Sequence, residues 1–149
     1  MGTIRSFREL RVYKAAVELR QCVFEVSKAW PKAERYALTD QIRRSSRSVG
    51  ANLAEAWSKR RYPRHFVAKL TDAHGEAEET GVWLDTAHEC GYLTDEAHFD
   101  LMAVVRASAG GLATMIRQSE AWANPPSDAA REPDIPYDLG QPFDLDANE

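Results

Sequence analysis

Cysteine is scarce in this chain, and several signals of export and membrane insertion are missing. Two cysteines, Cys22 and Cys90, in 149 residues are too few for a disulfide framework. No run of about 18 apolar residues is present, so we expect no transmembrane helix. No charged start followed by an apolar core opens the chain, so we expect no secretory signal. These absences predict a cytoplasmic protein that does not use a membrane.

The common sequence signatures of catalysis and cofactor binding are also missing. The chain has no Gly-x-Gly-x-x-Gly, no Walker loop and no Gly-x-Ser-x-Gly. Neither cysteine has a second Cys or a His at the spacing of a zinc site. We therefore predict that the protein is not an enzyme and binds no cofactor.

Proline is rare before residue 124, where only Pro31 and Pro63 occur, and strand signals are almost absent. Four long segments result, at about residues 5–30, 34–60, 64–90 and 94–123. Gly91 is suited to end the third helix, and Thr94 is suited to begin the fourth. Short connections between long helices predict an all-α fold, an antiparallel up-down four-helix bundle.

The last 26 residues differ in composition from the rest. They hold five of the seven prolines and seven acids against one base, Arg131. A Pro-rich acidic segment has little apolar surface to bury. We predict a bundle over residues 1–123 and an acidic, loosely ordered tail over residues 124–149.

The first helical segment carries two apolar stripes instead of one. One stripe holds Leu10, Tyr13, Val17 and Phe24, and the other holds Val12, Ala16, Leu19, Val23, Val26 and Trp30. One stripe would be enough for a bundle, so the second predicts packing against another subunit. Small residues of the second segment, Ser46 and Gly50, would allow close approach at that interface. The alternative is a wide interface inside a single bundle.

Positive charge is concentrated in the second segment and the turn that follows. Residues 32–69 contain ten bases and three acids, a local net charge of +7. Such a stripe is typical of a phosphate-binding surface, on which flanking aromatic side chains can stack against bases. The alternative is a solvated face that the acidic tail neutralises. The candidate residues for binding nucleic acid or a protein partner are Arg43, Arg44, Arg47, Lys59, Arg60, Arg61, Arg64, Trp57 and Tyr62.

One polar residue, Asn52, lies at the edge of the apolar stripe of the second segment, with Glu55 farther out. A buried asparagine needs hydrogen-bond partners. Glu78 of the third segment and Arg43 of a neighbouring subunit are candidates. We interpret Asn52, Glu55 and Glu78 as a structural polar network and not as a ligand site.

A metal site is a remote alternative. Asp85-x-x-His88 and Asp95-x-x-His98 imitate the Glu-x-x-His spacing of di-iron bundles, and an up-down bundle would bring both near one end. Such a site also needs inward carboxylates from the other two helices, which the sequence does not supply. We expect core or interface histidines and no metal.

The segment from Gln41 to Glu55 is the most distinctive part of the sequence. Its Gln-Ile-Arg-Arg-Ser block and its Asn-Leu-Ala-Glu, with Phe7, Leu10, Tyr13 and Ala16 upstream and Gly91-Tyr92-Leu93 downstream, resemble the 23S rRNA intervening-sequence proteins. The resemblance spans about residues 5–115. The chain departs from the family pattern at Ala56-Trp57 and at His74-Gly75-Glu76.

The resemblance implies a small cytoplasmic helical bundle that assembles into a ring, with five subunits expected. Some members are encoded inside intervening sequences of rRNA genes, and relatives are basic accessory proteins of diversity-generating reverse transcriptases. No enzymatic activity is associated with the family. We therefore predict a homo-oligomer, with five subunits from the resemblance, that presents repeated binding surfaces to a protein partner or to structured RNA or DNA.

Overall fold

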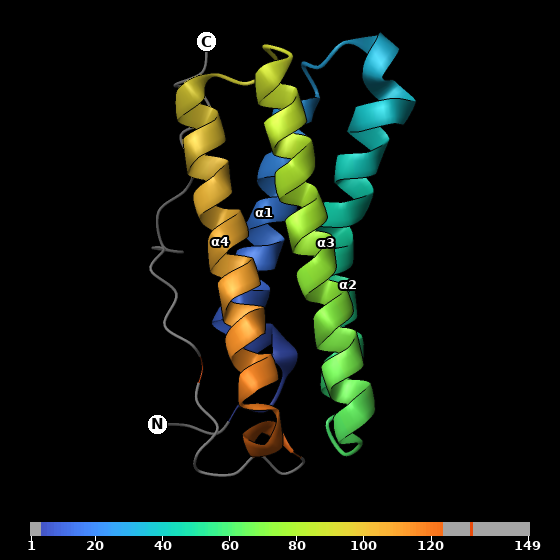
Figure 1. Ribbon diagram of the computed structural model, residues 1–149, viewed down its shortest axis with the longest axis vertical. Helices are drawn as coiled ribbons and strands as arrows, with labels where there is room; N and C mark the ends of the chain where they lie inside the picture. The colour runs from blue at the N-terminus through green and yellow to red at the C-terminus, as the bar shows by residue number, and fades with distance from the viewer. Residues whose placement is uncertain (1–3, 124–131, 133–149) are drawn as a thin grey trace.

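The computed structural model describes residues 4–123 and Glu132. Its four long helices are α1 (Arg11–Ser27), α2 (Asp40–Ser58), α3 (Pro63–Glu89) and α4 (Asp95–Arg117). They run alternately up and down, and both α1 and α3 pack against α2 and α4 (Figure 1). The predicted all-α four-helix bundle is confirmed. The predicted tail lies outside the described residues except for Glu132.

Short helical turns extend or precede the long helices. The 3₁₀ turn η1 (Phe7–Glu9) precedes α1, while η2 (Lys32–Glu34) and the π-helical turn η3 (Arg35–Thr39) lead into α2. A fourth turn, η4 (Ser119–Trp122), follows α4. Leu10 has extended backbone, with ψ at 134°, so α1 begins later than the apolar periodicity suggests.

The connections form where the sequence predicts them. Gly91 has a φ of +80°, its N–H bonds the carbonyl of His88, and the Tyr92 N–H bonds that of Ala87. This pair of bonds is the Schellman motif, which favours glycine at the left-handed position. Thr94 then caps α4, because its side chain accepts a hydrogen bond from the Ala97 N–H at 3.1 Å.

The interior consists of two apolar clusters separated by a polar layer. One cluster, around Leu53 and Phe66, fills the end near the start of α1, and the other, around Ile42 and Leu101, fills the opposite end. Four hydroxyl side chains are buried between them: Ser45, Ser46, Thr80 and Ser108. Ser46 and Ser108 donate to backbone carbonyls of their own helices, and Ser45 and Thr80 lie within hydrogen-bond distance of such carbonyls and of each other, so none loses a hydrogen bond on burial.

One helix of the described residues, α4, is long and apolar enough to span a membrane by length and composition alone. Half of its most apolar window is buried against the rest of the bundle. The core helix of a water-soluble bundle has the same properties, so this is weak evidence for membrane insertion.

Candidate partner-binding surfaces beside the second helix

The second apolar stripe of α1 faces the interior of the single chain. Val12, Ala16, Leu19, Val23 and Trp30 are buried, as are Ser46 and Gly50 of α2, while Val26 is partly buried. The prediction that these side chains form an outer interface is wrong, because the core clusters of the same chain already cover them. The alternative, a wide interface inside one bundle, describes the structure.

Close approach of α1 and α2 nevertheless depends on a small residue. A Cβ added at Gly50 would lie 3.3 Å from Cε2 of Tyr13. Glycine therefore lets the Tyr13 ring lie directly against the backbone of α2. Tyr13, Val17 and Phe24, from the other stripe of α1, remain partly exposed.

Three cations gather around one aromatic ring at the junction of α1 and α2. The distances to the Phe24 ring centroid are 4.7 Å from Lys28 Nζ, 4.8 Å from Arg43 Cζ and 5.7 Å from Arg47 Cζ. Cations over an aromatic face are attracted by its quadrupole. We call Phe24, Lys28, Arg43 and Arg47 the cationic seam.

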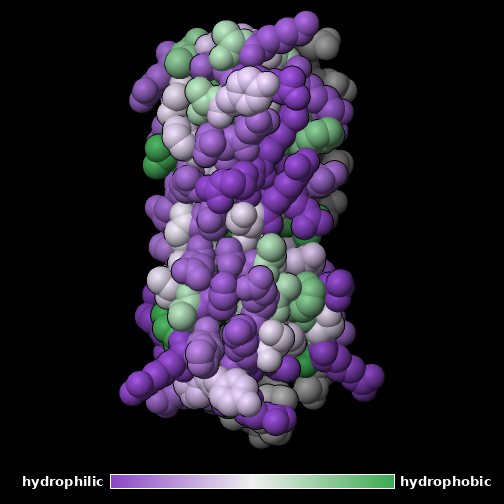
Figure 2. Space-filling model, turned by 90° about the vertical axis from the view of Figure 1, so that its right-hand side faces the viewer, coloured by the Kyte–Doolittle hydropathy of each residue, from purple (hydrophilic) through white to green (hydrophobic). Residues whose placement is uncertain are grey.

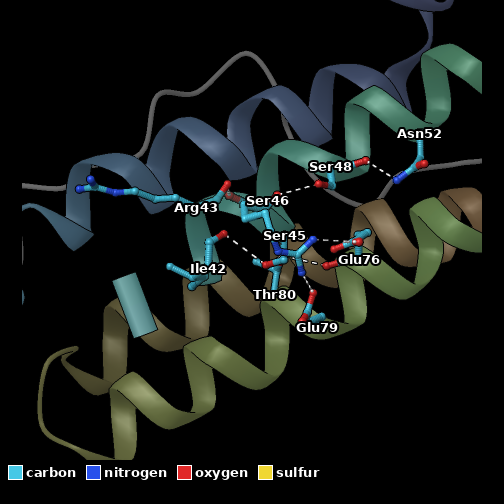
Figure 3. A network of polar contacts seen from close by, with 10 residues as sticks. Ile42, Arg43, Ser45, Ser46, Ser48, Asn52, Glu76, Glu79 and Thr80 are labelled. Atoms are coloured by element: carbon cyan, nitrogen blue, oxygen red, sulfur yellow. Dashed lines mark hydrogen bonds and ion pairs between the residues drawn. The ribbon is translucent and has the colours of Figure 1, made fainter. Parts of the chain in front are cut away.

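The positive charge of this seam is only partly compensated. Lys28 pairs with Glu25 at 3.0 Å. Arg43 donates from Nε to the neutral hydroxyl of Ser27 at 2.9 Å, and Figure 3 shows its side chain directed away from α3. Arg47 is exposed and lies four residues from Arg43, a like-charge spacing that disfavours an isolated helix. An anion bound here would relieve that repulsion.

The opposite flank of α2 is acidic. Arg44 pairs with Glu76 at 3.3 Å and with Glu79 at 2.7 Å, both on α3 (Figure 3). These two carboxylates raise the pKa of Arg44, which is therefore engaged within the bundle. Beside this pair lies an open hollow of about 370 Å³, lined by Asn52, Thr71, Asp72, Gly75, Glu76 and Glu79. We call Asp72, Glu76 and Glu79 the acidic seam.

Glu76 has the most buried side chain of the acidic seam. Burial of its carboxyl group and the neighbouring Glu79 carboxylate raise its pKa above the ordinary value despite Arg44. Its second oxygen, Oε2, is buried and has no hydrogen-bond partner among the residues that the structure describes.

The predicted polar network is not assembled as expected. Asn52 donates from Nδ2 to the carbonyl of Ser48 at 2.9 Å, within its own helix. Glu55 pairs with Lys69 at 2.9 Å, which lowers the Glu55 pKa. Glu78 lies exposed on another face of α3. The predicted contact between Asn52 and Glu78 is therefore wrong, because these side chains belong to different faces.

Trp57 is also placed differently from the prediction. It is only 7% exposed and packs edge-to-face on Trp122 of η4, with ring centroids 5.7 Å apart. Arg60 covers it, with Cζ 3.6 Å from the Trp57 ring and Nε 3.0 Å from its carbonyl oxygen. Burial lowers the pKa of Arg60. Trp57 is therefore not available to stack on a base, and Arg60 has a structural role.

The rest of the predicted basic group lies where α2 ends and α3 begins. Lys59 is the C-cap residue of α2, and Arg61, Tyr62 and Arg64 are exposed around the turn. Tyr62 is 58% exposed and packs edge-to-face against His65. These side chains form a second cationic surface at one end of the bundle.

The two Asp-x-x-His motifs meet at one end of the bundle, as predicted, but in a crossed arrangement. His88 Nε2 lies 2.6 Å from Asp95 Oδ1, and His98 Nε2 lies 2.7 Å from Asp85 Oδ1. The two imidazoles stack with centroids 4.2 Å apart. Within residues 4–123 and Glu132, no group of three or more His, Cys, Asp or Glu side chains is arranged to hold a metal. The crossed pairs join α3 to α4.

One contact joins the start of α1 to Glu132 and could not be predicted from the sequence. The backbone N–H of Arg11, at the start of α1, donates to the carboxylate of Glu132, whose other oxygen lies 3.9 Å from Arg11 Nε. Leu10 occupies the N-cap position and offers no side-chain acceptor. The Glu132 carboxylate therefore caps α1 and interacts favourably with the positive end of its helix dipole.

Sequence comparison decides which family the bundle belongs to. The family profile described as 23S rRNA-intervening sequence protein matches residues 8–112, more than half of the chain. The chain belongs to this family. The 23S rRNA-intervening sequence protein family has no established function and is not a known enzyme family. No curated protein matches the chain.

A solved structure supports the assignment. The chain is similar to a protein of unknown function from the S23 ribosomal protein family of Bacteroides thetaiotaomicron, with 26% identity and a TM-score of 0.64. The match covers 71% of this chain and 98% of the other. The shared part is thus essentially the whole of that protein.

Proposed function

We propose that this 23S rRNA-intervening sequence protein is a non-enzymatic, cytoplasmic docking platform. Copies of the bundle associate, with five subunits expected from the family resemblance, and present repeated surfaces to a protein partner. The observation that carries the proposal is the cationic seam, where three cations surround Phe24 and, among residues 4–123 and Glu132, only Lys28 has an acidic partner.

The chemistry of this seam favours an acidic, partly apolar protein segment. Guanidinium groups bind carboxylates through paired hydrogen bonds, and Arg43 and Arg47 both retain N–H donors that no described acid occupies. The partly exposed rings of Phe24 and Tyr13 add apolar contact area. Repetition of the seam around an oligomer would strengthen binding through avidity.

The experiment is a pull-down with tagged full-length protein and a matched pair of variants. We expect the wild type to recover one companion protein in stoichiometric amount, and Arg47→Glu to lose it. Lys14→Glu makes the same charge change at an exposed position of α1 outside the seam and should retain the companion. Equal recovery by wild type and Arg47→Glu would refute the role of the seam.

Structured RNA or DNA is the second candidate partner. The observation that favours it is the exposed group of Arg61, Tyr62 and Arg64, which forms a second cationic surface at the end of α2. Binding of phosphates should release counterions, so affinity for RNA should fall steeply with salt. Fresh protein should then show a high ratio of absorbance at 260 nm to that at 280 nm. A protein-like ratio and binding insensitive to salt would refute this candidate.

A further inference from the structure

Large apolar side chains are exposed on the outer surface of α3 and α4, two helices that pack side by side (Figure 1). Val82 of α3 is 56% exposed, and Phe99 of α4 is 69% exposed. Met102, which is partly exposed, connects them, because it lies one turn from Phe99 and its Cε would be 3.5 Å from a Cβ added at Gly81, the residue before Val82. The side of the molecule where α2 lies is, by contrast, mostly hydrophilic (Figure 2). Apolar side chains that gather on a surface, unlike single exposed ones, mark contact sites.

Exposed acids border this apolar group on both helices. On α3, one acid precedes Val82 by four residues and another follows it by three. On α4, two acids precede Phe99 by four and by three residues. Residues at these spacings are neighbours on a helix surface, so each carboxylate lies one turn from an exposed apolar side chain. We call the whole group the acidic-apolar patch: Glu78, Val82, Asp85, Asp95, Glu96, Phe99 and Met102.

The negative charge of the patch is little compensated. Its two aspartates each lie against an imidazole of the opposite helix, whereas Glu78 and Glu96 have no ion pair among residues 4–123 and Glu132. Residues 70–105 contain nine acids and no Lys or Arg. The next base, Arg106, lies one turn beyond Met102 on α4. The surface therefore combines exposed apolar area with negative charge, the opposite charge to that of the cationic seam.

We propose that the acidic-apolar patch docks a basic amphipathic helix of a protein partner. The apolar stripe of such a helix would lie on Val82, Met102 and Phe99, and lysines or arginines beside the stripe would approach the carboxylates. Negative charge disfavours the other candidate occupants. It repels the phosphates of a nucleic acid or of an anionic membrane. It also repels residues 124–149 of the same chain, which carry seven acids and one base.

This surface goes beyond the proposed function, because the cationic seam belongs to α1 and α2 and attracts an acidic segment. The acidic-apolar patch belongs to α3 and α4 and attracts a basic one. One subunit can therefore hold two different partners at the same time. Each surface repels the partner of the other, so charge assigns each partner to its own site.

The test measures binding of a synthetic helical peptide, with leucines along one face and lysines elsewhere, to the full-length protein by fluorescence anisotropy. Phe99→Ser should weaken binding about tenfold or more, and Glu78→Lys about fivefold. Tyr36→Ser replaces an equally exposed aromatic side chain outside the patch, and Glu120→Lys reverses an exposed acid in η4. Both controls should bind as the wild type does, and circular dichroism should show that every variant is folded.

Equal affinity of the wild type, Phe99→Ser and Glu78→Lys would overturn the inference, and so would a wild type that does not bind the peptide. Light scattering distinguishes a partner from a second copy of the chain. Phe99→Ser should keep the wild-type mass, and a lower mass would overturn the inference by showing that another subunit occupies the patch. Arg47→Glu should still bind the peptide, so failure of the cationic seam and failure of the patch are separate results.

Discussion

Ser45 of α2 and Thr80 of α3 lie with their hydroxyl oxygens 2.9 Å apart, in the buried polar layer between the two apolar clusters. The pair is extended at both ends, since Ser45 also lies within hydrogen-bond distance of the Ile42 carbonyl and Thr80 within that of the Glu76 carbonyl. The layer thus joins α2 to α3 directly beneath the acidic seam.

Replacing Thr80 by Val should destabilise the bundle by about 1 kcal/mol, because the shape is kept and the hydrogen bond between helices is lost. Ser45→Ala should cost a similar amount. The double variant should cost less than the sum of the two, since it leaves neither hydroxyl without its partner. Chemical denaturation of all four proteins measures these differences. Strict additivity would show that the 2.9 Å contact contributes no coupling.

The stability of the protein should depend on pH through Glu76. Its pKa is raised in the folded state, mainly by burial, from an ordinary value of 4.5. A raised pKa means that the folded state holds the proton more tightly than the unfolded state does. The resulting stabilisation is present below the ordinary pKa and is lost as pH rises through the raised value.

Glu76→Gln should remove this dependence. The unfolding free energy of the variant relative to wild type should therefore increase between pH 4 and pH 7. Glu78→Gln, an exposed position of the same helix, is the matched control. A relative stability of Glu76→Gln that is flat or falls over this range would show that Arg44 compensates the buried carboxylate fully.

Two glycines should respond oppositely to alanine. Gly91 has a φ of +80°, so Gly91→Ala should destabilise the bundle by about 1 kcal/mol. Gly110 lies within α4, and an added Cβ would meet no atom within 4 Å, so Gly110→Ala should stabilise it by about 0.5–1 kcal/mol. Thermal unfolding measures both. A gain at Gly91 would be incompatible with its left-handed role.

Protein purified from cells supplied with iron and manganese should contain far less than one metal ion per chain. The Nε2 atoms of His88 and His98 each lie against a carboxylate of the opposite helix. These contacts join α3 to α4, so the two Nε2 atoms do not point to a common metal position. Elemental analysis gives the answer directly, and a content near one ion per chain would revive the di-metal hypothesis.

Local chemistry made the helix connections predictable. Gly91 and Thr94 act within a few residues of their own positions, so a sequence alone reveals the end of α3 and the start of α4. The same holds for Pro63, which occupies the first turn of α3, where its missing N–H has no cost. The number of helices and their alternation follow from such signals.

Burial was harder to predict where distant segments decide it. Trp57 stands among bases in the sequence, but Trp122, far along the chain, covers it. Val23 belongs to a stripe that one helix alone does not explain, and the other helices of the bundle bury it. Periodicity shows that a stripe is apolar and does not show which helix covers it.

The charges of α2 illustrate the same limit. Arg43, Arg44 and Arg47 form one basic cluster in the sequence, yet the structure separates them. Arg44 pairs with Glu76 and Glu79 of α3, while the other two approach Phe24 of α1. A partner on another helix decides whether a surface cation is engaged, and spacing along one helix does not contain that information.

The most direct test of the account is the mass of the full-length protein in solution at micromolar concentration. Light scattering should report a particle several times heavier than the 16.8 kDa chain. A monodisperse particle near the mass of one chain at low salt would contradict the proposal that the protein works as an assembled platform.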